Sequence, residues 1–320
     1  MSDQESNFPS VKARAIKKLE RDMGAPLLVA LHHPKTIELM LNPDGRLWLE
    51  RLGEPITCIG DMHPSIGESI IKTIAGYHGK VVTTTTPSVE GEFPICGSRF
   101  AGQLSPIVLA PTFAIRKRAV AIFTLAQYVE QGIMTPEQYA FLQTAVANRS
   151  NIVICGGVGS GKTTLANAII KQMVIRNPIE RYVIIEDTGE LQCDGECVIQ
   201  YHSTSDTSMT ALVKMVLRMR PDRIIIGEVR GPEALDLLDA WNTGVEGGVA
   251  TLHSNTALSA LTRLRSLISR SQAAPLEIEP LIGEAVQVVV HIASIAGGRR
   301  VQEILEISGY ADGHYLTTTH

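Results

Sequence analysis

The sequence lacks a long apolar run, and it has few aromatic residues and no excess of positive charge. Its most apolar stretch, residues 281–296, is interrupted by Glu284, Gln287 and His291, whereas a membrane-spanning helix needs about 20 consecutive apolar residues. The chain is therefore not expected to span a membrane. Aromatic residues make up 5% of the chain and the net charge is −4. This composition argues against a surface built to hold nucleic acid, and we expect no direct sequence-specific nucleic-acid binding.

Cysteine is scarce as well. The chain has five cysteines, an odd number, and Cys155 falls inside a strongly apolar segment. Residues 1–7 are polar and acidic, unlike a secretory signal peptide. These features predict a reduced, cytoplasmic protein. Cys193 and Cys197 have no second Cys or His pair nearby with the spacing of a zinc site, so we interpret them as loop residues.

The sequence does contain a phosphate-binding motif, GGVGSGKT at residues 156–163, which fits the pattern GxxxxGK followed by Ser or Thr. The glycines allow backbone N–H groups to surround a phosphate, Lys162 supplies a positive charge to the β- and γ-phosphates, and the Thr163 hydroxyl is placed to bind Mg²⁺. Residues 151–155 predict a buried strand before the loop, and residues 164–174 predict a helix whose positive end faces the phosphates. We therefore predict a site for ATP and Mg²⁺. Its nucleotide-binding residues are expected to be Gly156, Gly157, Val158, Gly159, Ser160, Gly161, Lys162, Thr163 and Thr164.

At 320 residues, with 44% hydrophobic and 19% charged residues, the chain has room for two packed domains. We predict a smaller α+β domain over residues 1–116, a linker over 117–135 and an ATPase domain over 136–320. In the first domain, a Pro-Asp-Gly turn between two alternating runs predicts a β-hairpin over residues 36–50, and apolar periodicity predicts a helix over 63–77. Further strands are expected at 81–85, 92–100 and 105–108.

The C-terminal domain alternates apolar strands with helices. Its strands are expected at 151–155, 182–186, 197–201, 223–227 and 248–252. Alternation of this kind around a phosphate loop predicts a largely parallel sheet covered by helices on both faces. The fold class is therefore α/β, a P-loop NTPase domain preceded by a smaller α+β domain.

Three of these strands end in residues that carry chemistry. Glu186 and Asp187 end one strand, Glu228 and Arg230 follow another, and His253 ends a third. Because the carboxyl ends of parallel strands share one edge of the sheet, we expect these side chains to form one site with the phosphate loop.

The strand at 223–227 departs from a common NTPase pattern, in which Asp-Glu ends the strand, the Asp reaches Mg²⁺ and the Glu acts as base. Here Gly227 precedes Glu228. We therefore predict that Glu228 polarises the attacking water. Oxygen ligands for Mg²⁺ must then come from elsewhere, partly through water, and the predicted metal-binding residues are Thr163, Glu186 and Asp187. The predicted catalytic residues are Glu228, Glu186, His253 and Arg230.

Four segments together resemble the signatures of the secretion-ATPase superfamily, whose members power type II and type IV secretion, pilus assembly and conjugation. They are the phosphate loop, an Asp box IIEDTGEL at 184–191, an atypical Walker B segment at 217–230 and a His box at 241–255. ELMLNPDG at 38–45 and GSRF at 97–100 also resemble the N-terminal domain of that family.

The resemblance implies a RecA-like, Mg²⁺-dependent ATPase that forms a cytoplasmic homohexamer. Its partners would be other secretion or conjugation components at the inner membrane, where it would be peripheral on the cytoplasmic face. The resemblance also implies that Arg116 reaches the nucleotide from the N-terminal side. Three arginines are candidates for contacts with a neighbouring subunit or the γ-phosphate: Arg99, Arg218 and Arg230. Val245 replaces the first histidine of the usual His box, so any role that needs that imidazole is absent or moved.

Three functions are compatible with these motifs. The first is a motor ATPase that energises a type IV secretion or conjugative transfer apparatus. The second, a RecA-like DNA helicase or translocase, would require a channel lined with basic and aromatic residues, which the composition disfavours. The third, a nucleotide-gated switch or scaffold, is disfavoured by Glu228. A basic helix predicted over 11–23 is either a solvated first helix or a contact for a membrane surface or partner.

Overall fold

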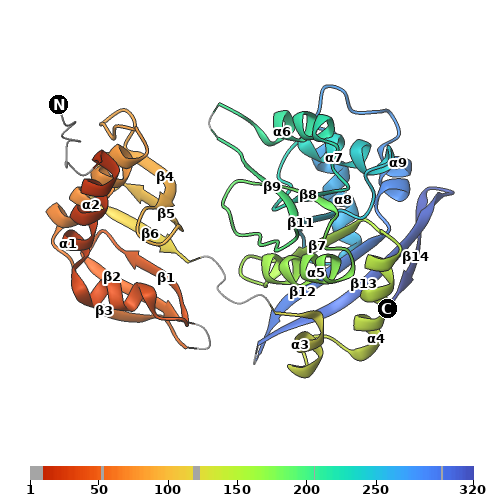
Figure 1. Ribbon diagram of the computed structural model, residues 1–320, viewed down its shortest axis with the longest axis horizontal. Helices are drawn as coiled ribbons and strands as arrows, with labels where there is room; N and C mark the ends of the chain where they lie inside the picture. The colour runs from red at the N-terminus through yellow and green to blue at the C-terminus, as the bar shows by residue number, and fades with distance from the viewer. Residues whose placement is uncertain (1–9, 52–53, 118–122, 205, 297) are drawn as a thin grey trace, which may run out of the picture. The chain divides into compact units, whose positions relative to one another are not determined.

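The computed structural model describes residues 10–51, 54–117, 123–204, 206–296 and 298–320. The chain forms two compact units, Met1–Val120 and Ala121–His320, each with its own sheet and apolar core (Figure 1). No helix among the described residues is long and apolar enough to cross a bilayer.

The first unit has a six-stranded sheet in the order β3-β2-β1-β6-β5-β4, and every neighbouring pair is antiparallel. Helices α1 (Val11–His32) and α2 (Pro64–Tyr77) pack against each other and share one core with the sheet. The sheet pairs Arg99 on β5 with Arg116 on β6. The strands are β1 Thr36–Leu41, β2 Arg46–Arg51, β3 Thr57–Asp61, β4 Ser88–Phe93, β5 Ser98–Gln103 and β6 Thr112–Arg116.

Some predicted elements of this unit differ from the structure. Helix α1 continues past residue 23 through a kink at Gly24, where φ is 71°. Residues 81–85 are not a strand, because the Thr83 side chain accepts a hydrogen bond from the Thr86 N–H at 3.1 Å and closes a turn. Residues 105–108 are a loop that contains Pro106, which has no N–H to donate to a sheet.

The second unit has an eight-stranded sheet in the order β14-β13-β12-β7-β11-β10-β8-β9. Neighbours from β12 to β9 are parallel, whereas β13 and β14 extend the sheet as antiparallel strands. The strands are β7 Ile152–Gly156, β8 Arg181–Glu186, β9 Cys197–His202, β10 Arg223–Ile226, β11 Val249–His253, β12 Val288–Ile295, β13 Gly298–Ala311 and β14 His314–Thr319. Strands β12 to β14 follow the last predicted strand in the sequence. Strand β12 pairs with β7 on the side opposite to β11.

Helices cover both faces of this sheet (Figure 1). Successive residues of β7 alternate between two cores: Val153 and Cys155 belong to one, and Ile152 and Ile154 to the other. This two-sided burial explains why the central strands are apolar throughout. The helices are α3 Leu125–Glu130, α4 Pro136–Ala147, α5 Lys162–Arg176, α6 Met209–Val216, α7 Glu233–Asn242, α8 Ala257–Ile268 and α9 Ile278–Ala285, with a 3₁₀ helix at Leu217–Met219.

The linker predicted over 117–135 differs from the structure in its second half. Residues 118–122 lie outside the described residues, but Leu125–Glu130 forms α3, which begins with a capping box. Leu125 and Tyr128 are buried in the core that α4 and α5 share. Burial of these two side chains attaches the segment to the second unit.

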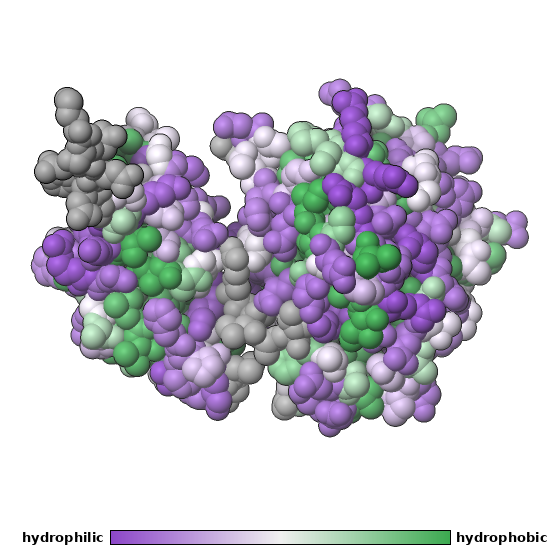
Figure 2. All heavy atoms as spheres, in the orientation of Figure 1, coloured by the Kyte–Doolittle hydropathy of each residue, from purple (hydrophilic) through white to green (hydrophobic). Residues whose placement is uncertain are grey.

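Most of the visible surface of both units is hydrophilic, and the green apolar patches are separated by purple side chains (Figure 2). Among the described residues, buried apolar side chains form three clusters, one in the first unit and two in the second. This distribution is that of two units which each bury a core of their own.

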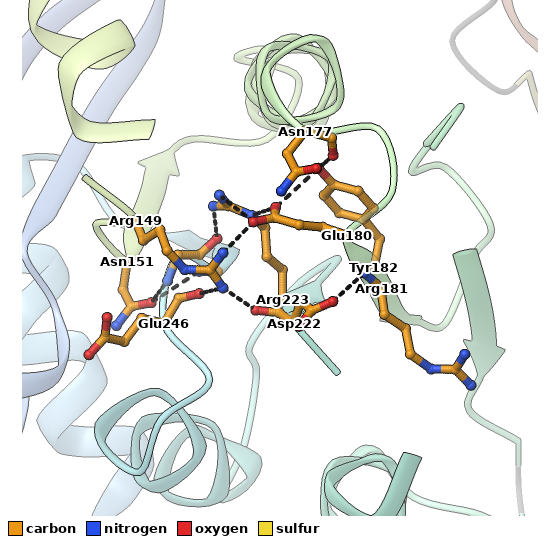
Figure 3. A network of polar contacts seen from close by, with 11 residues as sticks. Arg149, Asn151, Asn177, Glu180, Arg181, Tyr182, Asp222, Arg223 and Glu246 are labelled. Atoms are coloured by element: carbon orange, nitrogen blue, oxygen red, sulfur yellow. Dashed lines mark hydrogen bonds and ion pairs between the residues drawn. The ribbon is translucent and has the colours of Figure 1, made fainter. Parts of the chain in front are cut away.

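The amino edge of the second sheet holds a buried polar network (Figure 3). Glu180, just before β8, forms ion pairs with Arg223, the first residue of β10, and with Arg149, which precedes β7. Arg223 Nη1 also donates to the carbonyl of Gly247 at 2.8 Å, and the Tyr182 hydroxyl donates to Glu180 Oε2 at 3.3 Å. The network therefore ties together the starts of neighbouring parallel strands.

Candidate active site

The phosphate loop joins the end of β7 to the first residue of α5. Gly159 and Gly161 have φ angles of 70° and 97°, in the left-handed region that favours glycine, and they turn the chain into the helix. Residues 157–159 are exposed. The first turn of α5 therefore borders an exposed loop, an arrangement suited to phosphate.

Lys162 is buried beneath this loop. Its ammonium donates to the carbonyls of Gly156 and Gly157 at 3.2 Å and 2.9 Å. It also lies 3.2 Å from Nδ1 of His253, the last residue of β11. The structure thus brings the predicted phosphate-binding lysine and the His-box histidine together.

A continuous chain of polar contacts runs from this histidine across the strand ends. His253 Nε2 lies 3.0 Å from Glu228 Oε1, and Arg230 Nη2 donates to Glu228 Oε2 at 2.7 Å. Arg230 Nη1 in turn donates to Asp187 Oδ2 at 2.6 Å. Because β8, β10, β11 and β7 are neighbours in the sheet, these residues from distant parts of the sequence share one edge. The predicted association of the three strand ends with the phosphate loop is present in the structure.

The charges along this chain keep Glu228 ionised. Burial raises the pKa of the Glu228 carboxyl, but the hydrogen bond and charge of Arg230, together with the charges of His253 and Lys162, outweigh burial and leave the pKa below its ordinary value. The same pairing raises the pKa of the Arg230 guanidinium. A carboxylate held ionised beside a phosphate-binding loop can accept a hydrogen bond from a water molecule.

Glu186 lies at the same edge but is turned toward the protein. Its side chain is buried, and Oε2 accepts hydrogen bonds from the N–H groups of Glu190 and Leu191 at 2.6 Å and 3.0 Å. Asn167 on α5 holds the same loop by accepting from the Gln192 N–H at 2.9 Å. Glu186 therefore fixes the segment that carries Asp187.

The position of Glu186 also accounts for the unusual Gly227. A Cβ added at Gly227 would lie 2.8 Å from the Cβ of Glu186, closer than real Cβ contacts allow. An Asp at this position would need space that Glu186 already fills. The position of Glu186 at the end of β8 therefore accounts for the absence of a carboxylate at position 227.

The other predicted residues lie in three places. Thr163 and Thr164 are half-buried on the first turn of α5. Arg218 is exposed on the 3₁₀ helix after α6, and no hydrogen bond or ion pair joins it to a described residue of the site. Arg99 and Arg116 belong to the first unit.

The histidine missing from the His box falls outside this site. Val245 lies before β11, at the amino edge of the sheet, and it packs partly buried against the core on the α6–α9 face. A histidine at this position would lie at the opposite end of the strand from His253. The two ends of the His box therefore lie at opposite edges of the sheet.

Sequence reasoning missed Glu233, the first residue of α7. Its Oε1 accepts hydrogen bonds from the N–H groups of Arg230 and Gly231, both at 2.7 Å. This contact fixes the turn from which Arg230 reaches its two carboxylates. A carboxylate in the first turn of a helix that follows Gly-Pro is the sequence signal that indicates it.

The residues present fit a Mg²⁺ ion that is held jointly with phosphates. Within the described ranges there is no group of three or more Asp, Glu, His or Cys side chains that could enclose a metal alone. Mg²⁺ commonly uses only one or two protein oxygens together with phosphates and water. The Thr163 hydroxyl and the Asp187 carboxylate are of the right type for that arrangement.

The chain belongs to the family described as type II/IV secretion system protein, whose family model matches residues 99–300. Its relatives include the conjugal transfer protein TrbB of Rhizobium radiobacter, which is 47% identical over 95% of this chain and 94% of the relative. A probable conjugal transfer protein TrbB of Sinorhizobium fredii is 45% identical over 94% of this chain and 92% of the relative. The resemblance to secretion ATPases predicted from the motifs is confirmed.

Solved structures of secretion ATPases share the fold. The pilus retraction motor PilT with bound ADP superposes with a TM-score of 0.62 at 19% identity, over 87% of this chain and 80% of PilT. The VirB11 ATPase of the Brucella suis type IV secretion system, in complex with sulphate, superposes with a TM-score of 0.50 at 24% identity, over 92% and 96% of the two chains. The α/β fold class is therefore shared with secretion ATPases.

Proposed function

We propose that this protein hydrolyses ATP, as a motor that energises a type IV secretion or conjugative transfer apparatus. The observation that carries the proposal is the polar chain from Lys162 through His253, Glu228 and Arg230 to Asp187 beside an exposed phosphate loop. The names of the TrbB relatives support conjugative transfer as the setting.

In this mechanism, the residues around the loop have separate roles. Lys162 and the N–H groups at the start of α5 bind the phosphates, with the predicted loop residues 156–164 as the cradle. Glu228 accepts a hydrogen bond from the attacking water and orients it. His253 contacts both Lys162 and Glu228, so it connects the phosphate-binding lysine to the base. Arg230 holds the Glu228 carboxylate ionised.

When bound, Mg²⁺ would neutralise charge on the β- and γ-phosphate oxygens. We propose that the Thr163 hydroxyl and Asp187, the latter partly through water, hold the ion. Glu186 was predicted both as a ligand and as a catalytic residue. Because its Oε2 already accepts two backbone N–H groups, we assign its contribution to the position of the loop that carries Asp187.

The proposed active form is a cytoplasmic homohexamer, peripheral at the inner membrane together with other secretion components. None of the described contacts of Lys162 in the phosphate loop involves Arg99, Arg116 or Arg218. We propose these three arginines for nucleotide contacts within the ring, from the same or a neighbouring subunit. Mixing a Lys162→Ala protein with single arginine variants tests this. Recovery of activity in a mixture supports shared sites, and no recovery with any of the three arginines contradicts them.

The experiment for the proposed function measures ATP hydrolysis and nucleotide binding of the purified protein and of Lys162→Ala. We expect the variant to lose hydrolysis and to bind ATP more weakly, because the ammonium that faces the phosphates is gone. Equal turnover by the two proteins would reject the assignment of the phosphate loop. Strong stimulation by DNA at physiological salt would instead favour the helicase or translocase alternative.

A further inference from the structure

The phosphate loop has a neighbour on the side of β7 opposite to β11. Strand β12 pairs with β7, and the β12–β13 hairpin pairs Ser294 with Arg299 beyond the end of β7. A Cβ added at Gly161 would lie 3.0 Å from Cδ of Arg299, 3.4 Å from Nε and 3.6 Å from Nη1. The Arg299 side chain therefore lies against the last residue of the phosphate loop before α5.

The Arg299 side chain is positioned by the second unit itself. The N–H of Val301, on the same strand, donates to the carbonyl of Ile133 at 2.8 Å, which ties β13 to the segment after α3. Tyr128 on α3 is buried, which raises the pKa of its hydroxyl, while the charge of Arg299 acts on it in the opposite direction. The Arg299 side chain thus lies against the phosphate loop and near enough to α3 for its charge to act on Tyr128.

No hydrogen bond or ion pair joins the half-buried Arg299 guanidinium to any residue that the structure describes. A guanidinium offers five N–H donors and is always charged. A cation without an anionic partner, placed against a loop that binds phosphate, has the geometry of a ligand contact. We propose that Arg299 binds the nucleotide from within its own subunit, at the phosphate nearer to the ribose.

The order of the strands favours that end of the nucleotide. Lys162 contacts His253 on β11, and Glu228 follows β10, so the predicted site of water attack lies on the β11 side of β7. Arg299 arrives from the β12–β13 side. A nucleotide with its terminal phosphate at Glu228 would direct its other end toward Arg299. This inference rests on the proposed nucleotide binding at the loop, and it adds a residue that no motif indicated.

The test compares three variants: Arg299→Ala, Arg299→Lys and Arg300→Ala. Arg300 is the matched control, because successive side chains on a strand point to opposite faces and Arg300 is exposed. Fluorescent ADP is titrated into each protein and displaced with ADP or ATP, and steady-state hydrolysis then gives KM and kcat separately. Circular dichroism checks that each variant is folded.

We expect Arg299→Ala to lower the affinity for ADP and for ATP by the same factor. That factor should be roughly 10- to 100-fold, the effect of losing one charge-assisted hydrogen bond. The kcat at saturating ATP should change by no more than about twofold, because the base is elsewhere. Arg299→Lys should recover part of the affinity, and Arg300→Ala should match the parent.

Two results would overturn the inference while leaving nucleotide binding intact. The first is that the Arg299→Ala variant binds ADP as tightly as the Arg300→Ala variant does. The other is a loss confined to ATP or to kcat, which would place Arg299 at the γ-phosphate. Lys162→Ala is titrated in parallel: if the parent fails to bind nucleotide, or binds it without need of Lys162, the proposed function itself fails.

Discussion

The two edges of the eight-stranded sheet carry similar ion pairs in different surroundings. At the amino edge, the side chains of Glu180 and Arg223 are 8% and 3% exposed. At the carboxyl edge, the side chains of Glu228 and Arg230 are 16% and 52% exposed. Both networks join residues from separate strands, the amino-edge one as Figure 3 shows, so the difference lies in access to water rather than in connectivity.

The difference in exposure indicates that the amino-edge network has a structural role, whereas ion pairs of the carboxyl-edge network can be replaced by contacts with a ligand. A buried charge that loses its partner has no water to replace it, so the amino-edge pairs have to persist in the folded protein. An exposed guanidinium can leave one carboxylate for water or a phosphate at little cost. Similar residue types therefore hold strand starts at one edge and remain available to a ligand at the other.

The largest expected effect is on turnover at the carboxyl edge. Glu228→Gln keeps the shape of the side chain but removes its basicity, so single-turnover hydrolysis should fall by ~10²–10⁴-fold. ATP binding should persist or tighten, because a negative charge near the γ-phosphate is gone. Asp187→Asn is the matched comparison, and its defect should lessen as Mg²⁺ is raised. Parental turnover by Glu228→Gln would remove this residue from the proposed chemistry.

The next largest effect is on stability at the amino edge. Glu180→Ala leaves Arg223 buried without its carboxylate and should lower the free energy of unfolding by about 3–5 kcal/mol in urea titration. Replacing both, as Glu180→Leu with Arg223→Met, should cost much less because no charge is left unpaired. Glu228→Ala at the other edge should cost less than about 1 kcal/mol. Equal losses from Glu180→Ala and Glu228→Ala would end the distinction between the two edges.

A third, intermediate effect is expected at Gly227. Restoring the common carboxylate with Gly227→Asp should destabilise the protein by about 1–3 kcal/mol, because its Cβ would collide with Glu186. Thermal denaturation measures the loss, and the Mg²⁺ dependence of hydrolysis shows whether a ligand was gained. Gly231→Ala is not a suitable control, since it meets the flexible end of Glu233. Exposed Gly76 on α2, which has open space where a Cβ would lie, is a suitable control as Gly76→Asp. A stable Gly227→Asp protein with a lower Mg²⁺ requirement would contradict this account.

The smallest effect concerns pH. Because the folded-state pKa of Glu228 lies below its ordinary value of 4.5, the carboxylate stabilises the fold above that pH, and the contribution is lost as pH falls through the folded pKa. Arg230→Ala removes the main cause of the lowering. Its stability deficit should be below about 1 kcal/mol near neutral pH and should shrink below about pH 4.5. The acidic limb of hydrolysis should move to higher pH in this variant, and an unchanged limb would argue against control of Glu228 by Arg230.

Much of the site follows from the sequence alone, because its parts are local. The phosphate loop needs only the spacing of residues 156–163 between an apolar strand and a helix, and the structure has strand β7 and helix α5 on either side of it. Parallel strands share one edge for their carboxyl ends, so Glu228 and His253 could be placed together before any coordinates. The alternation of strand and helix likewise predicted a two-sided core.

Only the tertiary structure decided which of these side chains meet. Arg230 reaches Asp187 across 43 residues of sequence, and Glu186 is turned toward its own loop, because strand order and space around Gly227 select the contacts. Arg299 comes to the phosphate loop only because β12 adds to the free side of β7. Local spacing determines which residues can do chemistry, whereas packing between elements distant in sequence determines which of them share a site.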